Sequence, residues 1–155
     1  LESYIKLDGS KRRLLCANLK PRLRMTTMYY SAQARSYLVL GTTNKSEITV
    51  GYSTKHGDSG VDLQILGDLL KREVLELAKY LRIPSVIINR TPSGGLWAGQ
   101  TDEEEMGISY EQLDDYIEYN RGEPGVIERI ANLNRISEHK RQIPPIARIP
   151  EEIRK

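Results

Sequence analysis

The sequence predicts an α/β domain built on a parallel sheet with flanking helices. Residues 37–40 (YLVL) and 86–88 (VII) are short apolar runs that favour strands, and both have the character of a strand buried on two faces. Between them, residues 66–81 carry apolar side chains at helical spacing. Strand, helix and strand in alternation are typical of parallel α/β folds.

Three helices are expected in the first half of the chain. The clearest covers residues 66–81, where Asp68 is placed to cap the N-terminus. Pro21 fits the first turn of an earlier helix that runs to about residue 37, because a proline in that turn gives up no helical hydrogen bond. Ser46 can cap a short helix that ends near Val50.

Two more helices and two loops are expected in the second half. Ser109 followed by Gln112 matches a capping box, and residues 126–136 place apolar side chains along one helix face. Residues 90–99 are rich in Pro, Ser and Gly and predict a loop. The acidic residues 102–105 are interpreted as part of a solvated loop rather than as a metal site.

Composition narrows the class of protein. The 155 residues suit a single domain, and a net charge of +2 gives no sign of a basic face for nucleic acid. One cysteine fits a reducing compartment, and no apolar run approaches the ~20 residues that span a bilayer. No secretory leader is recognised. We therefore expect a cytoplasmic protein without nucleic-acid or membrane partners. The nine tyrosines and the absence of phenylalanine are not explained by the sequence alone.

Several familiar catalytic motifs are absent from the sequence. It has no Cys/His spacing suited to zinc, no G-x-S-x-G elbow and no convincing base for Cys16. Neither a Walker A motif nor the dinucleotide glycine fingerprint occurs. A phosphate site in this chain would therefore be of a less common kind.

Loops rich in Gly, Ser and Thr follow both predicted strands, at residues 41–43 and 91–95. Parallel sheets bind ligands in the crevice beyond the C-terminal ends of their strands, so a polar site is expected there. Gly41 allows a close approach of the backbone, and Thr42 offers a hydroxyl. Glu47 follows at the start of a helix, where it could ligate Mg²⁺ or only complement the helix dipole.

Positive side chains lie at two predicted helix starts. Lys71 and Arg72 sit near the N-terminus of the helix at residues 66–81, where the macrodipole disfavours a cation. Arg22 and Arg24 repeat the pattern in the first helix. An anionic ligand would explain these positions, because helix N-termini bind anions. Solvated side chains are the alternative.

Two more clusters allow either a binding role or an ordinary surface role. Lys55 and Asp62 flank a glycine-containing loop at residues 57–60, which could close over a polar ligand or form a plain surface turn. His139 and Lys140 belong to a basic cluster that could hold phosphate or face solvent.

Taken in order, these segments resemble the NAD synthetase family. The resemblance implies the adenine-nucleotide α-hydrolase-like, Rossmann-like fold of the N-type ATP pyrophosphatases. It also implies that ATP adenylates the carboxylate of deamido-NAD and that ammonia then displaces AMP, giving NAD with release of pyrophosphate. The similarity covers residues 18–145, through the runs NLKPRLRM, GTTNKSEITVGYSTKHGDSGVDLQILGDLLKREV, NRTPSGGLWAGQTDEEEMGISYEQLDDYI and EHKRQIPP.

The resemblance also assigns binding roles, residue by residue. The residues implied for ATP are Thr42, Lys71 and Ser93, with Glu47 as the ligand of Mg²⁺. The residues implied for deamido-NAD are Arg22, Lys55, Asp62, His139 and Lys140. Enzymes of this family are typically homodimers with the deamido-NAD site near the subunit interface, so a homodimer is expected.

One family motif does not occur in the sequence. The pyrophosphate loop S-G-G-x-D-S follows the family's first strand and supplies backbone amides and a metal-binding Asp. Without it, we interpret residues 1–155 as the C-terminal part of a NAD synthetase domain, inactive alone, with sheet edge and core exposed where the first strands would lie.

Other functions stay open at this point. Ammonia is the expected nitrogen donor because no glutaminase domain is present, but the chain could also be the synthetase part of a glutamine-dependent enzyme. A non-catalytic remnant that dimerises or binds a dinucleotide would bind deamido-NAD without turnover. An ATP pyrophosphatase for another carboxylate or base is a further alternative, against which the segment from Lys55 to Asp62 argues.

Overall fold

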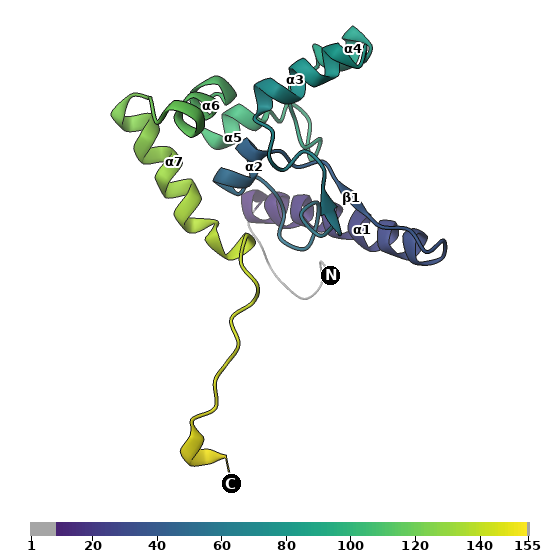
Figure 1. The fold of residues 1–155 in the computed structure, drawn as a ribbon, viewed down its shortest axis with the longest axis vertical. Coiled ribbons are helices and arrows are strands. Elements are labelled where there is room, and N and C mark those ends of the chain that lie inside the picture. The colour runs from purple at the N-terminus through teal and green to yellow at the C-terminus, as the bar shows by residue number, and fades with distance from the viewer. Residues whose placement is uncertain (1–8, 155) are drawn as a thin grey trace.

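The computed structural model describes residues 9–154, apart from the side chain of Ser10. These residues form, in chain order, α1 (Gly9–Gln33), β1 (Leu40–Gly41), α2 (Lys45–Val50), β2 (Leu63–Gln64), α3 (Lys71–Tyr80), α4 (Ser85–Ile88), α5 (Asp102–Met106), α6 (Tyr110–Tyr119), α7 (Pro124–Ile136) and the 3-10 helices η1 (Glu138–Lys140) and η2 (Glu151–Ile153). Between η1 and η2 the chain runs away from the body as an extended tail (Figure 1).

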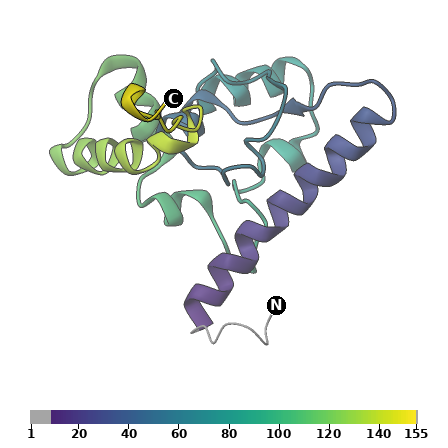
Figure 2. The same ribbon diagram turned by 90° about the horizontal axis from the view of Figure 1, so that it is seen from below.

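The predicted α/β class with a parallel sheet is confirmed, although the sheet is small. Strands β1 and β2 pair in parallel, with Leu40 opposite Leu63 and Gly41 opposite Gln64. Figures 1 and 2 show α1 on one side of the molecule and α6 and α7 on the other, with the sheet and long loops between them. No helix in the described part of the chain is long and apolar enough to cross a membrane.

The strand predictions need two corrections. Residues 37–40 are not a strand buried on two faces, because Tyr37 and Leu38 are exposed and pairing begins only at Leu40. Residues 86–88 are not a strand but part of α4. A run of three or four apolar residues carries too little periodicity to separate strand from helix, and here the backbone N–H groups of two of its isoleucines bond the carbonyl of Pro84.

Pro21 lies in the middle of α1 rather than in its first turn. A proline inside a helix removes one backbone hydrogen bond, and packing offsets that loss here. Pro21 is buried, and its Cβ would stand only 2.8 Å from a Cβ added to Gly57. Figure 2 shows α1 as one continuous helix through this position.

The predicted caps of α2 and α3 are wrong in detail. Asn44, not Ser46, caps α2, in a capping box with Glu47. Helix α3 begins at Lys71, so Asp68 does not cap it; that carboxylate is exposed and pairs with Lys45 at 3.1 Å.

The N-terminus of α3 is capped instead by side chains of two other helices. The backbone N–H of Lys71 donates to Ser46 Oγ over 3.0 Å, and that of Arg72 donates to Asp114 Oδ2 over 2.9 Å. The Ser46 hydroxyl in turn donates to Asp114 Oδ1. Both Ser46 and Asp114 are almost completely buried, so this arrangement fixes α2, α3 and α6 against one another.

The predictions for the second half of the chain are largely confirmed. Ser109 and Gln112 form both arms of the capping box of α6, and α7 covers the expected residues. The acidic segment was wrongly expected to be a loop: it forms α5, capped by Thr101. Acidic residues in its first turn complement the helix dipole and favour this helix.

The hydrophobic core lies among α2, α5, α6 and α7. Gly51 closes α2 in the left-handed region, at φ 64°, and a Cβ there would meet Ser137 at the end of α7. Large apolar side chains on α1, β1, α3 and α4 remain exposed, as the sequence led us to expect. The core residues are Val50, Met106, Ile108, Tyr110, Leu113 and Ile130.

Asp114→Ala is predicted to destabilise the fold by about 2–4 kcal/mol, because it leaves the Ser46 hydroxyl and the Arg72 backbone N–H buried without their acceptor. Urea unfolding measures this difference. The control is Asp115→Ala, at a partly exposed carboxylate that also pairs with Arg72 and should cost no more than about 1 kcal/mol. Equal losses in the two variants would contradict the capping role of Asp114.

Candidate functional site

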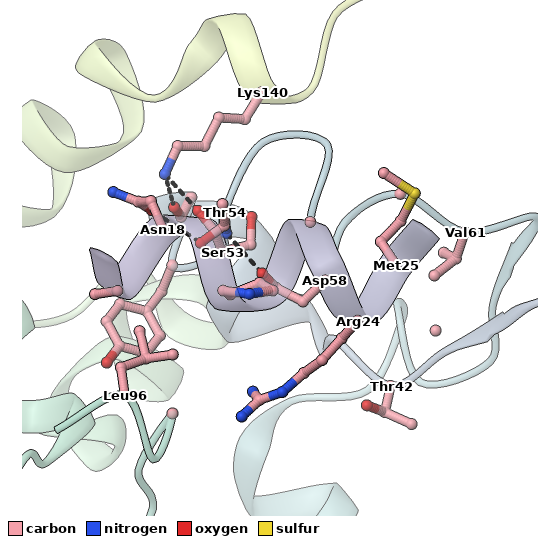
Figure 3. A pocket seen from close by; sticks show the side chains of 18 of the residues that line it. Asn18, Arg24, Met25, Thr42, Ser53, Thr54, Asp58, Val61, Leu96 and Lys140 are labelled. Atoms are coloured by element: carbon pink, nitrogen blue, oxygen red, sulfur yellow. Dashed lines mark hydrogen bonds between the residues drawn. The ribbon is translucent and has the colours of Figure 1, made fainter. Parts of the chain in front are cut away.

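A cleft of about 520 Å³ lies between α1, the end of β1, the loop at residues 51–61 and the loop at residues 94–100. Of the residues that the resemblance assigns, Thr42 and Lys140 line it. Figure 3 shows α1 crossing the cleft, with Lys140 reaching in from one side and Thr42 on another. The volume falls within the range of small-molecule sites, roughly 300–1,000 Å³.

Glu47 and Lys71, assigned to Mg²⁺ and ATP, are brought together beyond the C-terminal end of β1. Lys71 Nζ lies 3.3 Å from Glu47 Oε1, and both side chains are largely buried. The ammonium also lies 4.6 Å from the centre of the Tyr110 ring, which attracts a cation. Glu47 Oε2 accepts from the backbone N–H of Asn44, so the capping box of α2 holds the carboxylate toward Lys71.

The cations at the start of α3 have acidic partners within the chain. Lys71 pairs with Glu47, and Arg72 lies within 3.6 Å of carboxylates on α6, those of Asp114, Asp115 and Glu118. The buried cap of α3 also occupies its first backbone N–H groups. The position of these cations therefore does not by itself require an external anion.

Two tyrosine hydroxyls connect Glu47 to α5. The hydroxyl of Tyr110 lies 3.2 Å from Glu47 Oε1 and 3.0 Å from Asp102 Oδ2. The hydroxyl of Tyr52 lies 3.0 Å from Asp102 Oδ1 and within hydrogen-bond distance of Glu105 Oε2, and its single proton is available to either carboxylate. Burial raises the pKa of both phenols above the ordinary value, and the neighbouring carboxylates raise it further. Both hydroxyls therefore keep their protons at neutral pH.

The same network reaches the glycine-rich loop that contains Ser93. Gln100 is buried; its Nε2 donates to Glu105 Oε2 over 2.6 Å and its Oε1 accepts from the backbone N–H of Leu96 over 2.8 Å. Ser93 itself is exposed, and its hydroxyl accepts from the backbone N–H of Gly95. The loop is thus anchored at one end to the residues around Glu47.

Sequence reasoning missed the tyrosines and Asp102 of this network. Tyr110 and Glu47 are 63 positions apart, and Tyr52 and Asp102 are 50 apart, so no local pattern relates them. The excess of tyrosine over phenylalanine was the available signal. A phenylalanine at either position would pack equally well but would leave buried carboxylate oxygens without a donor.

Three of the residues assigned to deamido-NAD lie along the middle and the C-terminal part of α1. Arg22 Nε donates to the backbone carbonyl of Lys55 over 3.3 Å. Asp62 accepts from the backbone N–H of Val39 over 2.7 Å and from the hydroxyl of Tyr29 over 3.0 Å. Asp62 therefore fixes the start of β1, whatever else it binds.

His139 and Lys140 lie on η1, after α7. Lys140 Nζ donates to the backbone carbonyls of Gly51 and Ser53, each over 2.7 Å, and burial lowers its pKa. One of the three ammonium protons remains for another acceptor. His139 is exposed and has no hydrogen bond or ion pair within the described residues.

The described residues contain no group of three or more side chains of the kind that cages a metal ion. Mg²⁺ does not need one, because it usually keeps water and substrate phosphates and takes one or two carboxylates from the protein. The Glu47 carboxylate has the oxygen ligands that Mg²⁺ prefers, but Oε1 contacts Lys71 and Tyr110 and Oε2 accepts from Asn44, so a metal ion would have to share or replace one of these contacts.

Comparison with known proteins identifies the family. The family model described as NAD synthase matches residues 3–144. The chain belongs to the NAD synthase family. It is 62% identical over 153 residues to the NH(3)-dependent NAD(+) synthetase of Syntrophomonas wolfei. That match covers 99% of this chain but 61% of the relative, so the chain spans about three-fifths of the relative's length.

Solved structures agree with this assignment to a family of ligases. The structure of NMN synthetase from Francisella tularensis is similar with a TM-score of 0.87 at 37% identity, over 96% of this chain and 60% of that one. An NH3-dependent NAD synthetase from Campylobacter jejuni, solved in complex with the nitrate ion, matches with a TM-score of 0.71 at 26% identity, over 95% and 59%. The expected adenine-nucleotide α-hydrolase-like fold is thereby confirmed.

Deprotonation of the buried tyrosines is predicted to destabilise the fold at high pH. A phenol whose pKa is higher in the folded than in the unfolded chain contributes stability that is complete below about pH 10, the unfolded value, and is lost as the pH rises beyond it. Tyr110→Phe removes one such phenol. Its loss of stability above about pH 10 should be less steep, by up to about 1.4 kcal/mol per pH unit.

Urea unfolding at several pH values measures these slopes. The control is Tyr80→Phe, which removes an exposed hydroxyl and keeps both buried phenols, so it should show the slope of the parent chain. If Tyr110→Phe loses stability as steeply as the parent, the hydroxyl of Tyr110 does not hold its proton in the way described.

Proposed function

We propose that this chain carries part of the site for the ATP-dependent amidation of deamido-NAD by ammonia, with NAD, AMP and pyrophosphate as products. The observation that carries the proposal is the pair formed by Lys71 and Glu47, held beyond the end of β1 in a chain of the NAD synthase family. Its position matches that of ligands in parallel α/β folds, beyond the strand ends.

Electrostatics would contribute most to the first step. The carboxylate of deamido-NAD attacks the α-phosphorus of ATP, so two anions must approach each other. Lys71, with Thr42 and Ser93 as further ATP ligands, would offset that repulsion and hold the phosphates in line. Ammonia then displaces AMP from the adenylated carboxylate. None of these steps requires a covalent protein nucleophile.

Mg²⁺ would be held by Glu47 together with the ATP phosphates and would neutralise part of their charge. In the structure Glu47 Oε1 already contacts Lys71 and Tyr110. Tyr110 would keep the carboxylate oriented when Lys71 turns toward a phosphate.

The residues proposed for deamido-NAD retain donors that the fold does not use. Arg22 uses only its Nε, so both terminal nitrogens are available, and Lys140 keeps one ammonium proton. His139 and Lys55 add positive charge, and Asp62 fixes the start of β1. These positions suit an anionic dinucleotide.

We further propose a cytoplasmic homodimer that uses free ammonia and that the isolated chain does not turn over. The exposed apolar side chains of α1 support a protein partner for that helix. The missing S-G-G-x-D-S loop and the match to 61% of the Syntrophomonas wolfei relative support inactivity.

Amidation of a mononucleotide is a second candidate function. The observation that favours it is the TM-score of 0.87 to the NMN synthetase of Francisella tularensis, against 0.71 to the NAD synthetase of Campylobacter jejuni. The two candidates share the reaction and differ in whether the substrate carries an adenylate half.

A chimera distinguishes the two candidate functions. In it, this chain replaces the matching 153 residues of the Syntrophomonas wolfei relative. With ATP, Mg²⁺ and ammonium, the chimera should form NAD from deamido-NAD with a kcat/KM at least about tenfold above that for the mononucleotide acid, because Arg22 and Lys140 keep donors for a larger anion.

Chromatographic measurement of both amide products tests this expectation. A preference for the mononucleotide acid would replace the first function by the second, and amidation of neither acid would contradict both. The isolated chain is the control and should give no product; binding of deamido-NAD without turnover by the chimera would favour the non-catalytic remnant.

Lys71→Ala in the same chimera should lower kcat/KM for ATP by about tenfold to a hundredfold, because it removes one charge-assisted contact to phosphate. The KM for deamido-NAD should change by less than about twofold. Lys45→Ala, which removes a half-exposed lysine paired with Asp68, is the matched control. Equal effects on both substrates would count against an ATP-specific role for Lys71.

A further inference from the structure

The charged side chains that line the cleft differ in how many of their hydrogen-bonding groups are already occupied by other residues of the protein. Asp58 accepts from the backbone N–H of Thr54, and Glu105 accepts from Tyr52 and from an amide. Lys140 donates to two backbone carbonyls. Arg24, the other cation of the lining, makes no hydrogen bond, ion pair or ring contact within residues 9–154.

The backbone of Arg24 is nevertheless held at the wall of the cleft by α1. The side chain projects from α1, and the neighbouring turns of that helix, at Pro21 and Met25, line the same cleft. Figure 3 shows the guanidinium extending from the helix into the space between Leu96 and Thr42, which also line the cleft. The helix fixes the backbone, and the exposed side chain lines the cleft with its donors unused.

The composition of the cleft indicates which class of ligand would use those donors. A guanidinium presents five N–H groups in a planar fork that matches phosphate oxygens in pairs. Leu96, Trp97 and Met25 give the lining an apolar part that can pack against a ring system. One cation with unused donors, an apolar wall and a volume of about 520 Å³ together fit a nucleotide whose phosphate lies at Arg24.

We propose that Arg24 is a further substrate-binding residue, and that its guanidinium binds a phosphate group of the nucleotide held in this cleft. The inference rests on the proposed function only for the identity of that nucleotide, ATP or deamido-NAD, since both carry the same phosphate chemistry. The role of Arg24 differs from the roles proposed for Arg22 and Lys140, because some donors of those two residues already bond backbone carbonyls.

Isothermal titration of the chain with ATP, deamido-NAD and adenosine tests this role. Arg24→Met should weaken binding of the phosphate-bearing ligand of this cleft by about tenfold to a hundredfold and leave the binding of adenosine unchanged. Arg24→Lys should restore part of the loss, because an ammonium keeps the charge but not the planar fork. The nucleotide whose affinity falls, ATP or deamido-NAD, identifies the source of the phosphate.

The matched control is Arg35→Met, at an exposed arginine beyond the end of α1 that bonds only the carbonyl of Ser31 and does not line the cleft. It makes the same change of charge and should alter no affinity by more than about twofold. Thermal unfolding should be unchanged in all three variants, because both arginines are exposed.

Three outcomes would overturn the proposal. The first is a parent chain that binds neither nucleotide more tightly than adenosine. The second is an Arg24→Met variant with the affinities of the parent. The third is an equal loss for adenosine, which would show a packing role instead. Because these titrations need no turnover, failure to form NAD would reject the proposed function and leave the role of Arg24 to be decided by binding.

Discussion

The buried carboxylate of Asp114 is the contact on which the rest of the site depends. It lies on α6 and accepts from the hydroxyl of Ser46 on α2 and from the backbone N–H of Arg72 at the start of α3. Three helices from distant parts of the chain are thereby joined at one point. Because α3 starts there, Lys71 at its first position is held opposite Glu47 of α2.

Local signals in the sequence located the cap of α6 but missed the equally local capping box of Asn44 and Glu47 at α2. Ser109 and Gln112 form the capping box that their spacing indicated. The start of α3 could not be located in this way, because its caps come from 25 and 42 positions away, from Ser46 and Asp114. A local reading therefore chose Asp68, the nearest residue of the right type, and extended the helix too far.

In the site, too, contacts between residues far apart in the sequence could not be predicted from local patterns. The resemblance to the family assigned Glu47 to Mg²⁺ and Lys71 to ATP. In the structure their side chains lie within 3.3 Å of each other. The cations of α3 indicate a ligand less clearly, since the chain's own carboxylates already balance their charge. The hydroxyls of Tyr52 and Tyr110 could not be assigned from sequence, because their partners are fixed only by tertiary packing.

These contacts divide the cationic side chains of the site into two kinds. Lys71 and Lys140 are held by acceptors of the protein itself, so a ligand that binds them must share or replace those contacts, at a cost in affinity. Arg24 has no such competitor within the described residues and can offer all its donors to a ligand. The paired cations thus stabilise the shape of the site before binding, whereas the phosphate contact proposed for Arg24 would require no such exchange of partners.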